Sequence, residues 1–372
     1  MLELRGQVVR GAKSIAKLAR DWDELFERAN QPAPYLSRAW IQTFINEKNI
    51  KGAPLLIAVW CDYKLVALLP LTVISFCGIR LAMVVPTAEL CYTGVLVDPD
   101  YQDAIRAVAD IWVQEKVGHV FYNKYLSSMD EPTNLLIAEM SRRGFVYRRW
   151  KRHVCVWTNL EPSFDQVLRK RRTGDQRRWL LRKERRVFKQ GDVAVARFNG
   201  EQITPEITKR IAAIEQESWK NVIGRAVLGQ AFYQRLLVEM GKASLGCVWL
   251  ITKNGDDVAF LYAFRVKNSL YPKWMAFRLK YSSLTSMSFG KVLVMQVIRD
   301  ACDEGIRLLD LGFGEDPWKK LWATESHNIE RIIAGHGFIG NIAILGYSVL
   351  KWCARCEYLM RRYFRNFRRI RK

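Results

Sequence analysis

Two stretches far apart in the chain share one pattern of apolar and polar positions. In the first, apolar residues 56–60 and 65–69 flank a polar break at 61–64; in the second, residues 248–252 and 257–261 flank a break at 253–256. Each predicts a strand, a tight turn and a second strand, and Asn254-Gly255 is typical of a type I′ turn. The repeat favours two domains of one architecture in tandem, although two unrelated hairpins would give the same local pattern.

Hydrophobic periodicity predicts alternating helices and strands in both halves. Beside the hairpins, we expect helices at 13–29, 36–46, 101–116, 132–144, 164–190, 205–221, 229–240, 288–304 and 316–323. We expect further strands at 2–9, 81–86, 92–97, 118–124, 145–157, 192–198, 270–280, 306–311 and 329–334. The predicted fold class is therefore α/β (α+β), with domains at 1–160 and 161–340, each a mixed central sheet flanked by helices.

Composition narrows the possible partners. A chain of 372 residues that is 49% hydrophobic can bury two cores, and its net charge of +22 favours anionic partners such as a nucleotide-like cofactor, RNA, anionic lipid or an acidic polymer. Among eight cysteines only Cys353 and Cys356 have C-x-x-C spacing, so we expect no metal site. The N-terminus does not resemble a signal peptide and no segment is a clean membrane span, which favours a cytoplasmic protein.

Two segments carry most of the positive charge. Eleven Lys or Arg lie between Arg169 and Lys189, on a helix that either faces water or flanks an anion site. The last segment, 341–372, is predicted to be an amphipathic helix with nine Lys or Arg from Lys351 to Lys372. Its start is expected to pack on the second domain. Its basic end is either solvated or lies on the anionic inner face of the membrane; contact with RNA is less favoured.

The strongest local candidate for an anion site is the run 280–291, which links a strand to a helix. Small hydroxyl residues and a glycine at a helix N-terminus leave backbone N–H groups free for a pyrophosphate. The residues that would hold it are Lys280, Ser286, Ser288, Gly290 and Lys291. Ser288 as a plain helix cap is the simpler interpretation of that residue.

The second candidate is 308–322, where a predicted buried strand ends in Asp310 before a glycine-bearing turn and a short helix. Asp310, Glu315 and Asp316 could act as acids or bases, and Lys319 could stabilise an oxyanion or a phosphate. The alternative is that the acids cap the turn and the helix while Lys319 is solvated.

These motifs, in this order, resemble the GNAT-fold acetyltransferases of the cellulose-biosynthesis CelD/BcsL type. The run 314–323 resembles that family's Gly-Asp-Glu-Pro-Tyr-Lys-like stretch, with its two acids inverted and Trp318 in place of tyrosine. Residues 34–40 resemble its N-terminal Pro-Phe-x-Ser-x-x-Trp element, and 217–220 and the basic helix also match. The resemblance covers roughly residues 15–335.

The resemblance implies two tandem GNAT-like domains, as in the related Fem-type aminoacyltransferases. It implies an acyl-CoA donor, acetyl-CoA or another acyl-CoA, bound by the second domain, with Lys319, Asp310, Glu315 and Asp316 as catalytic candidates. A saccharide, amino-sugar or amino-acid-like acceptor would lie between the domains. Trp219, Lys220, Trp318 and Trp322 are candidates for contacting it, although Trp219 and Lys220 could equally fill the core.

Three functions follow from these observations. The first is a cytoplasmic N- or O-acyltransferase of exopolysaccharide or envelope synthesis. The second is Fem-like aminoacyl transfer from charged tRNA, which the net charge would suit. The third is a non-catalytic GNAT-fold scaffold that binds membrane or RNA. Retention on immobilised CoA would separate the first from the others.

Overall fold

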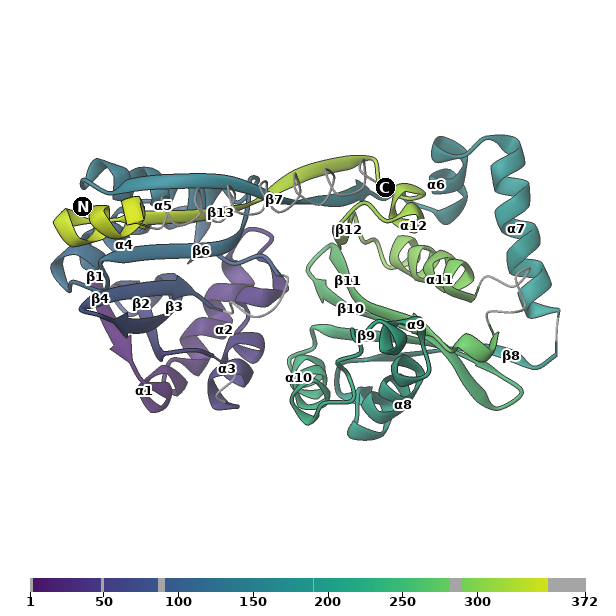
Figure 1. Ribbon diagram of the computed structural model, residues 1–372. Helices are drawn as coiled ribbons and strands as arrows, with labels where there is room; N and C mark the ends of the chain where they lie inside the picture. Colours follow the sequence, from purple (N-terminus) through teal and green to yellow (C-terminus); the bar gives the residue numbers. More distant parts are fainter. Residues whose placement is uncertain (1–2, 48–49, 86–90, 190, 282–288, 347–372) are drawn as a thin grey trace, which may run out of the picture.

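The first half of the chain alternates helices and strands as the hydrophobic pattern predicts. The structure is a computed structural model that describes residues 3–47, 50–85, 91–189, 191–281 and 289–346 (Figure 1). The elements of this half are β1 (Leu4–Arg10), α1 (Ala12–Ala16), α2 (Ala19–Arg28), η1 (Pro34–Leu36), α3 (Arg38–Asn46), β2 (Ala53–Cys61), β3 (Lys64–Phe76), β4 (Ile79–Val84), β5 (Leu96–Val97), η2 (Pro99–Tyr101), α4 (Ala104–Gln114), β6 (Val120–Ser127), α5 (Glu131–Arg142) and β7 (Val146–Asn159).

The second half repeats this alternation. Its elements are α6 (Phe164–Arg171), α7 (Gly174–Phe188), β8 (Val193–Asn199), η3 (Gly200–Gln202), α8 (Pro205–Gln216), α9 (Trp219–Val222), α10 (Ala231–Lys242), β9 (Gly246–Lys253), β10 (Asp256–Val266), β11 (Ser269–Phe277), η4 (Leu279–Tyr281), α11 (Phe289–Asp303), β12 (Leu308–Phe313), α12 (Pro317–Lys320) and β13 (Glu325–Gly335). Both predicted hairpins are present, as β2–β3 and β9–β10. Asn254 and Gly255 both have positive φ, at 48° and 81°, which agrees with the type I′ turn.

All thirteen strands of the described residues belong to one mixed sheet, in the order β1-β2-β3-β4-β6-β13-β7-β12-β11-β10-β9-β8, with β5 paired to β3. Each half contributes three antiparallel pairings followed by one parallel pairing, β4–β6 in the first and β11–β12 in the second. The helices α4 and α11 make the corresponding crossovers. The shared order confirms the predicted fold class of two tandem units.

The last strand of each half lies against the other half. β13, the last strand of the described residues, pairs with β6 of the first half, whereas the end of β7 pairs with β12 of the second. The two exchanged strands also pair with each other, and Figure 1 shows them running between the halves. The domain boundaries at 160 and 340 stay a prediction. A cut at these positions assigns β7 to the first half and β13 to the second, although β7 also pairs with β12 and β13 with β6.

Several predicted elements differ from the structure. The predicted helix 13–29 is divided into α1 and α2, and the predicted helix 205–221 into α8 and α9. The basic segment 164–190 forms two helices, because the Thr173 side chain accepts the Gln176 N–H and the Gln176 side chain accepts the Thr173 N–H, a capping box that begins α7. The strand predicted at 92–97 shortens to β5, because the segment before it is anchored by side chains. Thr133 Oγ1 accepts the Val95 N–H at 2.9 Å and Asn123 Nδ2 donates to the Thr93 carbonyl at 2.8 Å.

An aromatic cluster joins the two halves into one core. Tyr35 and Trp40, from η1 and α3, meet Phe264 of β10 at ring-centroid distances of 5.8 and 5.4 Å. Trp40 also stacks on Trp274 of β11 at 6.4 Å. Offset and edge-to-face pairs of this kind add to the free energy of burying the rings. The predicted Pro34–Trp40 motif is therefore part of the junction between halves.

The helix predicted from residue 341 begins at 337, and the structure describes it as far as 346. Ile344 packs on Val120 of β6 and Ile333 of β13, so the start of this helix lies on the first half of the molecule and not on the second as expected. Residues 347–372, with the basic end, lie outside the described residues. Among the helices that are described, none has both the length and the apolarity needed to cross a bilayer.

Candidate functional site

The parallel strands β11 and β12 separate soon after they begin. They pair only at Ser269–Leu308 and Leu270–Leu309 within the described residues, so beyond these positions the facing edges of β11 and β12 are not paired with each other. On β12, the Gly312 N–H and the Phe313 carbonyl are bonded to the Asp310 and Lys319 side chains instead. β11 also bulges, because Pro272 and Trp274 face consecutive residues of β10 and leave Lys273 extra. The Lys273 ammonium lies 5.0 Å from the ring centroid of Tyr35. A residue of the first half therefore lies beside the position where β11 and β12 separate. Bulges often re-aim side chains beside active sites.

The predicted pyrophosphate residues lie at the far end of β11 and at the start of α11. Ser286 and Ser288 lie outside the described residues. Lys280 is exposed and pairs with Asp256 at 2.8 Å. Lys291 lies 4.6 Å from the Trp179 ring centroid, and Lys183 of α7 lies 4.7 Å from the same centroid. Burial and the nearby Lys183 lower the pKa of Lys291. Positive charge is therefore gathered where α11 begins.

Gly290 lies in the first turn of α11 with room beside it. A Cβ added there would lie 3.6 Å from the Phe277 ring, in ordinary van der Waals contact. A side chain at this position is therefore tolerated by the fold, and its effect on a ligand can be tested separately from its effect on folding.

Lys319 is a buried cation at the end of the second motif. It is 8% exposed, its Nζ donates to the Phe313 carbonyl, and it lies 3.7 Å from Asp316. Burial lowers the pKa of Lys319, while the nearby Asp316 and Asp310 carboxyl groups oppose that change. Gly312 and Gly314, with φ of 75° and 89°, make the turn that brings α12 back beside β12. The lysine is thus held rigidly and is not the solvated residue of the alternative interpretation.

Asp310 is buried on β12 and is hydrogen-bonded on both oxygens. Tyr92 Oη donates to its Oδ2 at 2.7 Å, while the Gly312 N–H donates to its Oδ1 at 2.8 Å. Cys155 Sγ lies 3.6 Å from Oδ1 and also hydrogen-bonds to Tyr92 Oη. Burial raises the pKa of Asp310, and the bonds from Tyr92 and Gly312 oppose the rise. Burial likewise raises the pKa of Tyr92 well above its ordinary value.

The two other predicted acids lie apart from this buried network. Glu315 and Asp316 are exposed, and Glu315 reaches Lys320 at 3.9 Å. Asp316 begins α12 without capping it through its side chain. The structure therefore brings Lys319 near Asp310 and Asp316, and leaves Glu315 at the surface.

The predicted acceptor residues occupy two separate places. Trp219 is 43% exposed on α9, and the next residue, Lys220, pairs with the fully buried Glu215 at 3.2 Å. Glu215 also accepts the N–H groups of Val227 and Leu228, so it pins the loop after α9. Trp318 is partly buried, and Trp322 is 3% exposed within the core of the second half. The indole of Trp322 packs under the guanidinium of Arg172, 5.3 Å away.

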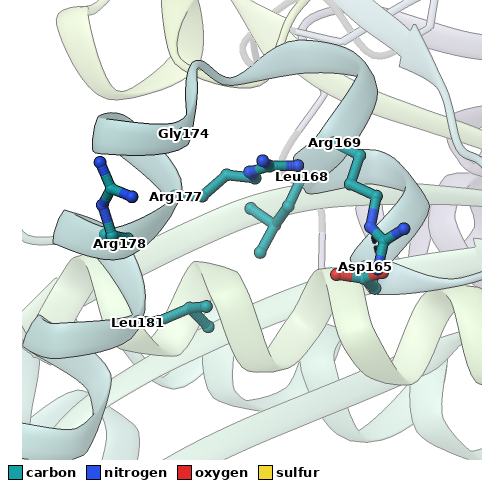
Figure 2. Close-up of a pocket in the computed structure, with 7 residues that line it drawn as sticks. All are labelled: Asp165, Leu168, Arg169, Gly174, Arg177, Arg178 and Leu181. Carbon is teal, nitrogen blue, oxygen red and sulfur yellow. Dashed lines mark ion pairs between the residues drawn. The ribbon is translucent and has the colours of Figure 1, made fainter.

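The basic segment contributes both buried and surface arginines. Arg171 donates to the Trp322 carbonyl at 2.9 Å and, like Arg172, is partly buried. On the outside, α6 and α7 form a pocket of about 350 Å³ lined by Asp165, Leu168, Arg169, Gly174, Arg177, Arg178 and Leu181. Figure 2 shows Arg177 reaching from α7 toward Leu168, and Arg169 paired with Asp165 at 2.7 Å. This pocket lies on the outer side of the second half.

The sequence did not predict the roles of Tyr92, Cys155 and His327. Each stands in its own segment, and the three meet only because β7 and β13 are exchanged. The Val154–Trp157 run and the Leu308–Leu311 strand both predict buried strands, but nothing local indicates that they are neighbours. No pattern in the sequence indicates a partner for His327.

Comparison with known proteins agrees with this geometry. Residues 174–320 match the family model described as an acetyltransferase (GNAT) domain. The match spans α7 to α12, within the second half of the chain. The separated strands β11 and β12, the bulge at Lys273 and the start of α11 all lie within the matched residues. No curated protein matches the sequence.

Solved structures of similar fold extend over both halves. FemX has a TM-score of 0.62 at 11% identity, covering 84% of this chain and 95% of that one. The C-terminal domain of a putative lysylphosphatidylglycerol synthetase from Agrobacterium fabrum has a TM-score of 0.55 at 12% identity, covering 90% and 96%. A conserved protein of unknown function from Bacteroides thetaiotaomicron has 0.51 at 10%, covering 86% and 97%. At these identities the likeness establishes the fold alone.

Proposed function

We propose that the protein transfers an acyl group from acyl-CoA to an amine or hydroxyl of a saccharide, amino-sugar or amino-acid-like acceptor. The acyl group that we propose is acetyl. The observation that carries the proposal is the early separation of β11 from β12 inside a GNAT domain. An extended amide chain, such as the arm of CoA, can hydrogen-bond to a strand whose backbone groups are free. The start of α11, with Lys291 and Lys183 close by, suits the phosphates of the same molecule.

The chemical step is assigned to the buried groups beside this separation. Lys319 would stabilise negative charge that develops on the acyl oxygen or on the leaving thiolate. Asp310, Glu315 and Asp316 remain the acid–base candidates, and Trp219, Lys220, Trp318 and Trp322 the acceptor candidates. The CelD/BcsL resemblance adds exopolysaccharide or envelope synthesis, in the cytoplasm, as the setting that we propose.

Calorimetry with acetyl-CoA on wild type and Gly290→Asp tests the donor site. The added carboxylate would face the pyrophosphate at the start of α11, so we expect the affinity to fall about tenfold or more, or roughly 1.4 kcal/mol. Gly290→Ala separates charge from bulk and should bind more tightly than Gly290→Asp. Equal affinity in wild type and Gly290→Asp, or no binding by wild type, would contradict the proposal.

A second candidate, Fem-like aminoacyl transfer from tRNA, is favoured by the arginine-lined pocket between α6 and α7. Phosphate backbones bind such surfaces in a salt-dependent way. Transfer from aminoacyl-tRNA but not from acetyl-CoA would select this candidate. Salt-dependent tRNA binding without any transfer would favour the non-catalytic scaffold instead.

A further inference from the structure

His327, Cys155 and Asp310 lie in a row across three neighbouring strands. β13 places His327 opposite Cys155 of β7, and Cys155 Sγ lies 3.6 Å from Asp310 Oδ1 on β12. Tyr92, from the first half, lies across this row. Its hydroxyl donates to Asp310 at 2.7 Å and its ring centroid lies 5.8 Å from that of His327. Residues from both halves therefore meet beside Lys319, whose charge acts on Asp310 and Cys155.

Cys155 and Tyr92 keep their protons at neutral pH, and Asp310 has both oxygens engaged in hydrogen bonds. Asp310 already accepts bonds on both oxygens, from Tyr92 and from the Gly312 N–H. Burial raises the pKa of Cys155 and of Tyr92, so the thiol and the phenol keep their protons. Burial raises the pKa of Asp310, but both of its oxygens are already bonded, so taking a substrate proton would require one of these bonds to break.

His327 has the properties that the other three lack. Both ring nitrogens are buried, and neither has a hydrogen-bond partner among the described residues. Leaving a buried polar group unsatisfied costs about 1–3 kcal/mol, so such a group in a folded protein calls for an explanation. Burial lowers the pKa of His327, with the charge of Asp310 opposing, so the imidazole is neutral at pH 7 and can accept a proton.

We propose that His327 is the proton acceptor of the acyl transfer, with Tyr92 and Asp310 as positioning residues. This inference rests on the proposed function. The acceptor nitrogen or oxygen forms its bond to the acyl carbon, and the carbon–sulfur bond breaks with its electron pair leaving on the CoA thiolate. The proton lost by the acceptor moves to a ring nitrogen of His327, and from there to the thiolate or to water. The imidazolium formed in this step is stabilised by the negative charge of Asp310.

Kinetics of His327→Gln, with acetyl-CoA and a panel of glucosamine, glycine and lysine as acceptors, test the proposal. We expect kcat to fall about 10²- to 10⁴-fold with acetyl-CoA affinity unchanged. His336→Gln, at a histidine that stacks on Phe145 outside this site, is the matched control and should keep full activity. In His327→Ala, added imidazole should restore part of the rate, which a purely structural role for the side chain would not allow.

A measurement without turnover separates this inference from the proposed function. The titratable groups near His327 are Asp310, Cys155 and Tyr92, and Lys319 acts on two of them, Asp310 and Cys155. NMR titration of the His327 ring should therefore give a pKa below the ordinary histidine value, and Asp310→Asn should lower it further. If acetyl-CoA binds but the His327 ring is an imidazolium at pH 7.5, the role of His327 is overturned and the proposed function stands. The same holds if acetyl-CoA binds and His327→Gln is as active as wild type. Failure of acetyl-CoA to bind would overturn the proposed function.

Discussion

The Lys319 side chain is buried and its ammonium is held in one position, unlike that of a surface lysine. Its ammonium is bonded to the Phe313 carbonyl and is held near Asp316. A cation that is already positioned needs little reorganisation when negative charge develops next to it. Burial also lowers its pKa, so the charge state of this lysine depends on the acids around it.

Lys319→Met should therefore lower kcat about 10²- to 10³-fold and leave acetyl-CoA affinity unchanged, on the scale of losing one oxyanion donor. Release of the CoA thiol under saturating acetyl-CoA measures the change. Lys320→Met, at the exposed neighbour, is the control and should keep the wild-type rate. Unchanged turnover in Lys319→Met would assign this lysine to the stability of the turn.

At this scale the sequence predicted what is local in the chain. Asp310 and Lys319 belong to one short run that follows a strand, so chain order alone indicates that they are close. Tyr92 and His327 approach Asp310 from segments far away along the chain, and no spacing rule relates them. The histidine was recognisable only after its two unpartnered nitrogens were seen in the structure.

Helix caps determine where several elements begin. Thr173 divides the basic segment into α6 and α7, and Asp130 caps α5 by accepting the Thr133 N–H at 3.1 Å. Burial raises the pKa of Asp130 to about 6, and its bonds to Thr133 oppose the rise. Folding thus favours the protonated form of this cap, because its pKa in the unfolded chain is about 3.9.

The stability of the protein should fall as the pH rises from about 4 to about 6, by up to about 3 kcal/mol from this group. The sign follows because the folded state holds the proton more tightly, so the stabilisation is complete below pH 4 and lost above pH 6. Asp130→Asn keeps a capping side chain and removes the titration. Urea unfolding should show a flatter profile for Asp130→Asn, and Glu131→Gln, at an exposed acid, is the control. Parallel profiles for wild type and Asp130→Asn would contradict the prediction.

Elements were predictable from sequence where their cause is local. The Asn254-Gly255 turn and the hairpin around it need only neighbouring residues. The break at Thr173 is also local, but the apolar and basic pattern continues across it and indicates one long helix. The segment before β5 is held by hydrogen bonds to Asn123 and Thr133, which lie far along the chain. No neighbouring residue therefore indicates that this segment is not a strand.

The helix at 337–346 presents an apolar stripe to the outside of the molecule. Phe338, Ile342 and Leu345 follow helical spacing and are 81%, 50% and 64% exposed. The nine basic residues of the tail follow in sequence, although they lie outside the described residues. An exposed apolar face next to concentrated positive charge suits an anionic lipid surface.

Removing the chain after Arg355, or replacing Phe338 with Ser, should weaken binding to vesicles that contain phosphatidylglycerol. Each Lys or Arg near the surface contributes about 1 kcal/mol, which is lost progressively as salt increases. Co-sedimentation at low and high salt measures this. Phe76→Ser, at a phenylalanine that is 75% exposed elsewhere, is the control and should pellet like wild type. Pelleting that ignores salt and lipid charge would rule out the tail as a membrane anchor.

Whole-molecule arrangement was predictable only in part. The repeated hairpins indicated two similar units, and their strands do follow the same order. The exchange of the last strands could not be predicted, because each of them pairs with a strand of the other half, β7 with β12 and β13 with β6. Nothing local in either segment indicates that partner. The composite row of Tyr92, Cys155, Asp310 and His327 depends on that exchange.

The position of β13 has a consequence for synthesis on the ribosome. The sheet of the first half is completed only when residues 325–335 pair with β6, although the remainder of that half is made much earlier. Until then the edge of β6 is open, and unpaired strand edges invite pairing with other chains. The nascent protein should therefore need protection by a chaperone through most of translation, and a chain stalled before residue 325 should aggregate.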